Sequence, residues 1–194
     1  MARVTFFFDV GSPYAWLAAE RVDTILPVTV GWQPVLLGGL FRAAGRGSWG
    51  VTADREAGMA EVSRRARERG LPAVRWPDPW PGDYLLAMRA TTYAGRLGRA
   101  REFALAAFRA AFVGGVDLGW PENVTAVGRA VGLDPAELEA GAADPAVKHT
   151  LRAATDAAFA LGVVGVPTVA VGDALFWGDD RLEEAAAYLR GRSA

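Results

Sequence analysis

Ser12 stands where a strand-like run gives way to a helical one. Residues 4–9 are mostly apolar, with β-branched and aromatic side chains, and Ser12-Pro13 begin a segment with helical spacing. The first N–H groups of a helix are unpaired and the helix dipole is positive there, so this position favours an anion such as a thiolate. A serine hydroxyl can donate a hydrogen bond to that anion, or it can simply cap the helix. The local sequence leaves both roles open.

The chain has no cysteine and a single histidine, His149. It can therefore neither form a disulfide nor supply a thiol of its own, and a dithiol–disulfide cycle is excluded. One histidine is too few for a histidine-based zinc site, so no metal is expected. A proline loop at residues 165–168 (GVPT) is of the kind that lines thiol sites. A reacting sulfur at this site must then belong to a small molecule.

Composition narrows the classes of partner. The 194 residues are 52% hydrophobic and 22% charged, as in an ordinary globular domain. A formal net charge of −1 gives no electrostatic case for nucleic acid. No run of about 18 apolar residues is present and the first residues lack signal-peptide features, so we expect no membrane contact and a cytoplasmic location. The arginine-rich run at 64–69, which includes Glu68, is expected to be a solvated helix face.

Hydrophobic patterns divide the chain into β-rich ends and a helical middle. Strands are predicted at 4–9, 28–35, 168–171 and 174–177, the last two joined by a Gly-Asp hairpin turn. Helices are predicted at 13–25, 36–44, 53–69, 84–97, 99–112, 123–131, 135–140 and 145–161, with a last helix opened by Asp180. The two ends therefore supply a β-α-β and a β-β-α unit.

These units predict an α/β fold, a thioredoxin-like four-stranded mixed sheet with a large inserted all-helical domain. We place the thioredoxin-like domain at residues 1–40 plus 162–194. The inserted helical domain is then residues 41–161.

Three stretches of the chain resemble 2-hydroxychromene-2-carboxylate isomerases. They are residues 8–18 (FDVGSPYAWLA), residues 34–43 (PVLLGGLFRA), and residues 165–168 (GVPT) with 176–182 (FWGDDRL). This family belongs to the DsbA-like branch of the thioredoxin superfamily and is close to kappa-class glutathione transferases. Its members place a serine where redox relatives keep a Cys-x-x-Cys pair, and here Ser12 occupies that position. The resemblance implies chemistry that uses glutathione.

The resemblance also implies a set of thiol-binding residues. They are Ser12, Val166, Pro167, Gly178, Asp179, Asp180 and Arg181. The Val166–Pro167 bond is expected to be cis, which turns the backbone of Val166 toward the bound peptide. Asp180 is expected to take the ammonium group of a γ-glutamyl end. Asp179 stands where relatives often carry an uncharged residue, so the thiol is predicted to be glutathione or another low-molecular-weight thiol.

The substrate-binding residues follow from the same resemblance. Arg42 is predicted to pair with a substrate carboxylate, and Tyr84 to offer its phenol. Trp49 either stacks on an aromatic ring or anchors its loop against the core. Asp83 replaces the asparagine usual in relatives. These departures indicate a changed substrate rather than a changed fold.

The predicted function is a glutathione-dependent isomerase that interconverts 2-hydroxychromene-2-carboxylate and trans-o-hydroxybenzylidenepyruvate, or acts on a similar aromatic hydroxy-acid. Ser12 would steady the sulfur while a thiolate adds transiently to the conjugated carbon. Two alternatives stay open, a kappa-like glutathione transferase or peroxidase, and a non-catalytic thiol-binding protein. The resemblance implies a homodimer.

Overall fold

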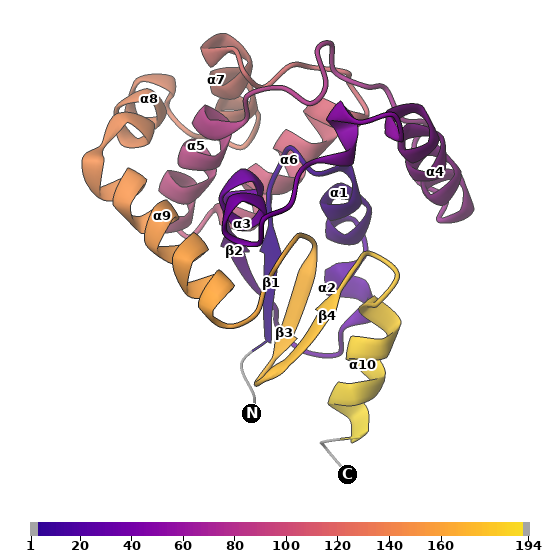
Figure 1. Ribbon diagram of the computed structural model, residues 1–194. Coiled ribbons are helices and arrows are strands. Elements are labelled where there is room, and N and C mark those ends of the chain that lie inside the picture. Colours follow the sequence, from indigo (N-terminus) through magenta and orange to yellow (C-terminus); the bar gives the residue numbers. More distant parts are fainter. Residues whose placement is uncertain (1–3, 192–194) are drawn as a thin grey trace.

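A four-stranded sheet forms the centre of the molecule (Figure 1). The computed structural model describes residues 4–191. The strands are β1 (Val4–Phe8), β2 (Gly31–Pro34), β3 (Thr168–Val171) and β4 (Ala174–Trp177), and they lie in the order β2-β1-β3-β4. β1 is parallel to β2 and antiparallel to β3, and β3 is antiparallel to β4. The predicted mixed sheet is confirmed, as are the bounds of the C-terminal hairpin.

β1 lies inside the sheet and leads the chain to the site. Its β-branched and aromatic residues favour extended backbone. Phe6 and Phe8 are fully buried, with ring centroids 5.6 Å apart, and Trp32 of β2 packs edge-on against both rings. This packing anchors β1, so the residues that follow Phe8 leave the sheet at a fixed point.

The segment between β2 and β3 is helical. Its elements are α3 (Leu37–Ala43), the 3₁₀ turn η1 (Trp49–Val51), α4 (Arg55–Glu68), α5 (Leu85–Arg96), α6 (Ala100–Phe112), α7 (Pro121–Ala130), α8 (Pro135–Ala143) and α9 (Pro145–Ala160). In Figure 1, α5, α7, α8 and α9 gather on the left, and α4 stands on the right beyond α1. The last helix, α10 (Leu182–Gly191), follows β4. Within the described residues, no helix has both the length and the apolar character needed to cross a membrane.

Three predicted elements are wrong in their bounds, and one of them is α8, which ends at Ala143 instead of residue 140. Instead of one helix over 13–25, the chain forms α1 (Pro13–Ala19) and a single turn, α2 (Val22–Ile25). Arg21 between them has a φ of −126°, outside the helical range. β2 is shorter than the predicted strand at 28–35, because only Gly31–Pro34 pair with β1.

α1 is enclosed by other elements. Ala15, Trp16, Leu17 and Ala18 have no exposed surface. Both α4 and α6 contact α1, so helices from the middle of the chain cover a helix from its beginning. Charges near a buried helix start are screened less than charges in water, which strengthens the effect of the helix dipole there.

Candidate functional site

Ser12 is the N-cap residue of α1. Its Oγ accepts a hydrogen bond from the Ala15 N–H at 3.2 Å, and Pro13 occupies the first helical position. The capping role is therefore confirmed. The Ser12 O–H itself donates to no acceptor among residues 4–191, although the residue is only 4% exposed. Capping uses a lone pair of the oxygen and leaves its hydrogen available for a ligand.

Two cavities meet at Ser12. The larger cavity, about 460 Å³, is bounded by the loop after β1, by α3, by η1 and by the chain from Trp80 into α5. The smaller cavity, about 250 Å³, is bounded by α1, α4, the proline loop at 165–167 and the turn after β4. Four residues line both cavities: Ser12, Leu37, Phe41 and Trp49. A ligand in one cavity therefore lies beside a ligand in the other.

The smaller cavity gathers most of the predicted thiol-binding residues. Ser12, Val166, Pro167, Gly178, Asp179 and Asp180 all line it. The Val166–Pro167 bond is cis, as expected. The Gly178 N–H donates to the Pro167 carbonyl at 3.0 Å, which joins the turn after β4 to the proline loop. Arg181 is not in the cavity wall and pairs with Glu184 instead.

Asp179 is buried and paired with two arginines of the α4 region. Its carboxylate accepts a hydrogen bond from Arg65 at 2.7 Å and another from Arg69, and only 2% of its side chain is exposed. The Asp180 carboxylate lies 3.4 Å from the same Arg65. The negative charge of Asp179 is thus compensated within the protein.

The predicted solvated face at 64–69 is therefore wrong for two of its residues. Arg64 does lie at the surface, where it pairs with Glu61 and Glu68. Arg65 lines the smaller cavity, and its guanidinium lies 5.5 Å from the centre of the Tyr14 ring. The spacing of Arg65 and Arg69, four residues apart and so on one helix face, was the only signal of their shared role.

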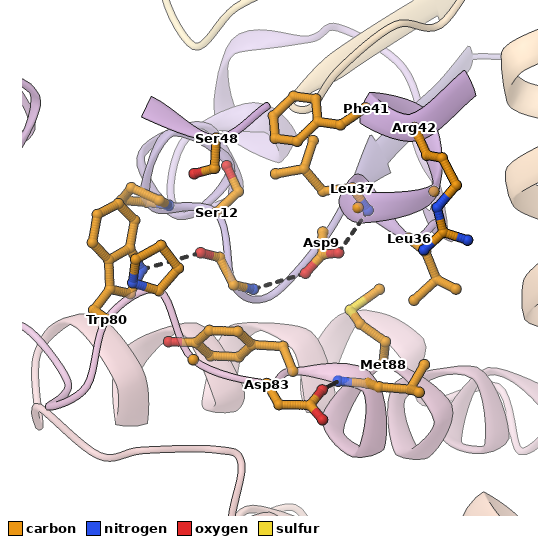
Figure 2. A pocket seen from close by; sticks show the side chains of 18 of the residues that line it. Asp9, Ser12, Leu36, Leu37, Phe41, Arg42, Ser48, Trp80, Asp83 and Met88 are labelled. Atoms are coloured by element: carbon orange, nitrogen blue, oxygen red, sulfur yellow. Dashed lines mark hydrogen bonds between the residues drawn. The ribbon is translucent and has the colours of Figure 1, made fainter. Parts of the chain in front are cut away.

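Aromatic side chains form much of the wall of the larger cavity. Trp49 lies 4.9 Å from Trp80 and 6.0 Å from Tyr14, measured between ring centroids. Trp80 is 5% exposed, and its Nε1 donates to the Gly11 carbonyl at 3.4 Å (Figure 2). Trp49 therefore anchors its loop within an aromatic cluster. It also lines both cavities, and its stacking on a substrate ring stays a prediction.

Tyr84 forms part of the same wall and has an unused hydroxyl. Its ring packs so closely on Gly11 that a Cβ there would lie 2.5 Å from it. The Tyr84 Oη is buried and has no hydrogen-bond partner in the described part of the chain. Burial raises the pKa of Tyr84, and the charges of Asp117 and Asp9 raise it further. Tyr84 is therefore a neutral phenol whose donor is unused within the described residues.

The two charged residues predicted for the substrate also line the larger cavity. Arg42 is exposed and forms no ion pair within residues 4–191. Asp83 is exposed too, and its Oδ1 accepts the Leu85 N–H at 2.9 Å at the start of α5. The structure thus brings Arg42, Trp49, Asp83 and Tyr84 to one cavity, as the resemblance implied.

Asp9 is a site residue that the sequence analysis missed. It directly follows β1 and is 7% exposed, and its carboxylate accepts the N–H groups of Gly11 at 2.9 Å and Leu37 at 2.8 Å (Figure 2). Burial raises the pKa of Asp9 to about 6, although both backbone hydrogen bonds lower it. A carboxylate at the end of an otherwise apolar strand was the signal in the sequence.

No group of three or more metal-ligating side chains is found among the described residues.

The chain is similar to known proteins along nearly its whole length. The family of DSBA-like thioredoxin domains matches residues 3–190. The 2-hydroxychromene-2-carboxylate isomerase of Sphingobium xenophagum is 27% identical over 191 residues, which cover 96% of this chain and 97% of its own. Human glutathione S-transferase kappa 1 is 27% identical over 207 residues, covering 96% and 90%. A solved structure of a 2-hydroxychromene-2-carboxylate isomerase superposes with a TM-score of 0.86 at 25% identity, covering 98% and 97%.

Proposed function

We propose that this chain, which belongs to the family of DSBA-like thioredoxin domains, is a glutathione-dependent isomerase of the 2-hydroxychromene-2-carboxylate type. The family resemblance read from the sequence is confirmed by relatives of that name across nearly the whole chain. One structural observation supports the proposal most: Ser12 lies in the wall of both cavities. A sulfur held at Ser12 in the smaller cavity adjoins a substrate in the larger one.

The smaller cavity fits a low-molecular-weight thiol with a peptide backbone. The Ser12 O–H is an unused donor, and no hydrogen bond of the Val166 backbone is found within residues 4–191. The wall also holds charged groups of both signs: Arg65, which is already paired with Asp179, and the exposed Asp180. Glutathione carries carboxylate, ammonium and peptide groups, so each of these protein groups has a counterpart on it.

Ser12 and the start of α1 are the groups that would favour a thiolate over a thiol. A hydrogen bond to a charged group is worth about 1.5–3 kcal/mol. The first N–H groups of α1 add positive potential. Together they are expected to lower the pKa of a bound thiol by about one unit or more. The thiol, when bound, supplies a nucleophile that adds to the conjugated carbon and leaves a single bond free to rotate before the sulfur departs.

The larger cavity is the proposed substrate site. Arg42 has no competing ion pair in the described part of the chain, so it is available for a substrate carboxylate. The Tyr84 Oη, buried without a partner, is available for a substrate oxygen. Trp49 and Trp80 provide flat apolar surface for an aromatic ring.

An absorbance assay tests the proposal. Conversion of 2-hydroxychromene-2-carboxylate to trans-o-hydroxybenzylidenepyruvate is followed with and without glutathione, and we expect turnover only with it. The Ser12→Ala variant should lose about tenfold or more in kcat/KM, which corresponds to one lost hydrogen bond to a charged group. Ser63→Ala is the matched control, since the Ser63 hydroxyl is exposed on α4 and donates to the Met59 carbonyl.

Two results would overturn parts of the proposal. Equal rates in Ser12→Ala and the parent would remove Ser12 from the mechanism. No turnover in the presence of glutathione would remove the isomerase function.

The protein is also expected to be a homodimer, which size-exclusion chromatography with light scattering measures directly.

A kappa-like transferase or peroxidase is the second candidate, supported by the similarity to human glutathione S-transferase kappa 1 over 96% of the chain. It would use the same thiol cavity. The two functions differ in whether the thiol is consumed, so a count of free thiol during turnover separates them. Binding of glutathione without turnover of either kind of substrate would indicate a thiol-binding protein.

A further inference from the structure

Asp9 differs from the other carboxyl group in the wall of the larger cavity. Asp83 is exposed, whereas Asp9 is 7% exposed. Asp9 also has no cationic partner: within residues 4–191 its carboxylate accepts hydrogen bonds only from backbone N–H groups. A buried carboxyl without a counter-charge is costly, so its position beside a ligand cavity indicates a chemical role.

The two backbone hydrogen bonds hold the Asp9 carboxyl in a fixed orientation. Oδ1 accepts from Gly11, the residue before Ser12, and Oδ2 accepts from Leu37 at the start of α3 (Figure 2). Each oxygen keeps a second lone pair for another partner. Gly11 and Leu37 both line the larger cavity, so the fixed carboxyl lies at the edge of the space offered to the substrate.

The geometry points to Asp9 as the group that transfers the proton when the ring of the hydroxychromene opens and closes. This inference rests on the proposed function and adds a step to it. Carbon 2 of the substrate bears both a hydroxyl and the ring oxygen, so a single carboxyl group can reach the two oxygens in turn. The thiol takes no part in this step.

The step balances within the substrate and Asp9. The Asp9 carboxylate takes the proton of the hydroxyl group, a carbonyl forms at carbon 2, and the bond from carbon 2 to the ring oxygen breaks. The electron pair of that bond goes to the phenolic oxygen, which then receives the proton back from Asp9. Ring closure is the reverse. The Tyr84 side chain lines the same wall, and its hydroxyl has no partner among residues 4–191.

The ionisation of Asp9 suits this role. Burial raises its pKa to about 6, which leaves the two protonation states close in free energy near neutral pH. The other titratable and charged groups in the cavity wall are Arg42, Asp83 and Tyr84, and Asp117 lies beside Tyr84. Burial outweighs the two backbone hydrogen bonds in setting the pKa.

A pH profile of Asp9→Asn tests the inference. With saturating glutathione, the parent should show a kcat/KM that falls below about pH 6, whereas Asp9→Asn should lose this limb and about 10²–10⁴-fold in kcat. Affinity for glutathione, measured by calorimetry, should change by less than about twofold, because Asp9 does not line the smaller cavity. Asp54→Asn, an exposed aspartate before α4, is the control for the chemical change.

The outcomes separate the two claims. If Asp9→Asn keeps the acidic limb and merely slows the reaction equally at every pH, Asp9 is only a structural clamp and the inference falls while the isomerase function stands. If the parent shows no glutathione-dependent isomerisation, both fall. If Asp9→Asn does not fold, a ¹³C NMR titration of the Asp9 carboxyl in the parent decides: a pKa equal to that of the kinetic limb supports the inference, and a different value overturns it.

Discussion

The two cavities that meet at Ser12 treat their buried polar groups in opposite ways. In the smaller cavity, the buried carboxylate of Asp179 is paired with Arg65 and Arg69. In the larger cavity, Asp9 has no cation and the Tyr84 hydroxyl has no partner among the described residues. The first arrangement fixes a turn of the chain, and the second leaves groups that a ligand can satisfy. In the proposed function, the smaller cavity holds the thiol and the larger one holds the substrate, whose oxygens can pair with these unused groups.

The two arrangements also differ in the free energy that a substitution costs. A buried polar group without a hydrogen bond costs about 1–3 kcal/mol. A buried ion pair that loses one partner costs about 3–5 kcal/mol. Stability is therefore most sensitive to substitutions beside the smaller cavity, and catalysis to substitutions beside the larger one. Three experiments measure this contrast.

Removing both cations from Asp179 should have the largest effect. The double variant Arg65→Met/Arg69→Met leaves a buried, uncompensated carboxylate, so its unfolding free energy in urea should fall by about 3–5 kcal/mol. Arg64→Met is the matched control on the same helix, because Arg64 pairs only with surface glutamates, and it should change stability little. Equal stability of the double variant and this control would show that Asp179 is not a structural anchor.

The pH dependence of stability should report Asp9. Its pKa in the fold is about 6, above the value near 4 in an unfolded chain, so the stability that it contributes is fully present below about pH 4 and is lost as the pH rises through 6. Relative to Asp9→Asn, the parent should therefore lose about 2–2.5 kcal/mol of unfolding free energy between pH 4 and pH 7. Parallel stability curves for the two proteins would contradict a raised pKa.

Removing the Tyr84 hydroxyl should have the smallest effect on stability and the opposite sign. Tyr84→Phe deletes a buried group that has no partner in residues 4–191, so the unfolding free energy should stay the same or rise by up to about 1 kcal/mol. The KM for the hydroxychromene should rise at the same time, because the substrate loses a donor. A large loss of stability would mean that the hydroxyl is satisfied within the protein.

The sequence predicted the parts of the molecule that depend on local pattern. The apolar run of β1, the Gly-Asp hairpin and the cap at Ser12 each carry their signal within a few residues, and all are confirmed. The cis bond at Val166–Pro167 came from family resemblance, because proline alone favours the trans form.

What the sequence did not predict depends on contacts between distant segments. In the sequence, Arg65 and Arg69 have the pattern of surface residues on a charged helix. In the fold, both pair with Asp179, which lies more than 100 residues later in the chain. The sequence shows Asp9 only as a residue at the end of a strand, whereas in the fold Tyr84 and Met88 join it in the wall of one cavity. The break between α1 and α2 lies in the backbone of Arg21, which no hydrophobic pattern marks.

The pairing of Asp179 with Arg65 and Arg69 also limits which segments can be deleted from this protein. α4 belongs to the stretch between β2 and β3, whereas Asp179 belongs to the last 30 residues of the described chain. A shortened scaffold that kept the four strands and discarded this stretch would retain the proline loop but not the counter-charges of Asp179. The smaller cavity therefore cannot be transferred with the sheet alone, because the helical stretch supplies part of its wall.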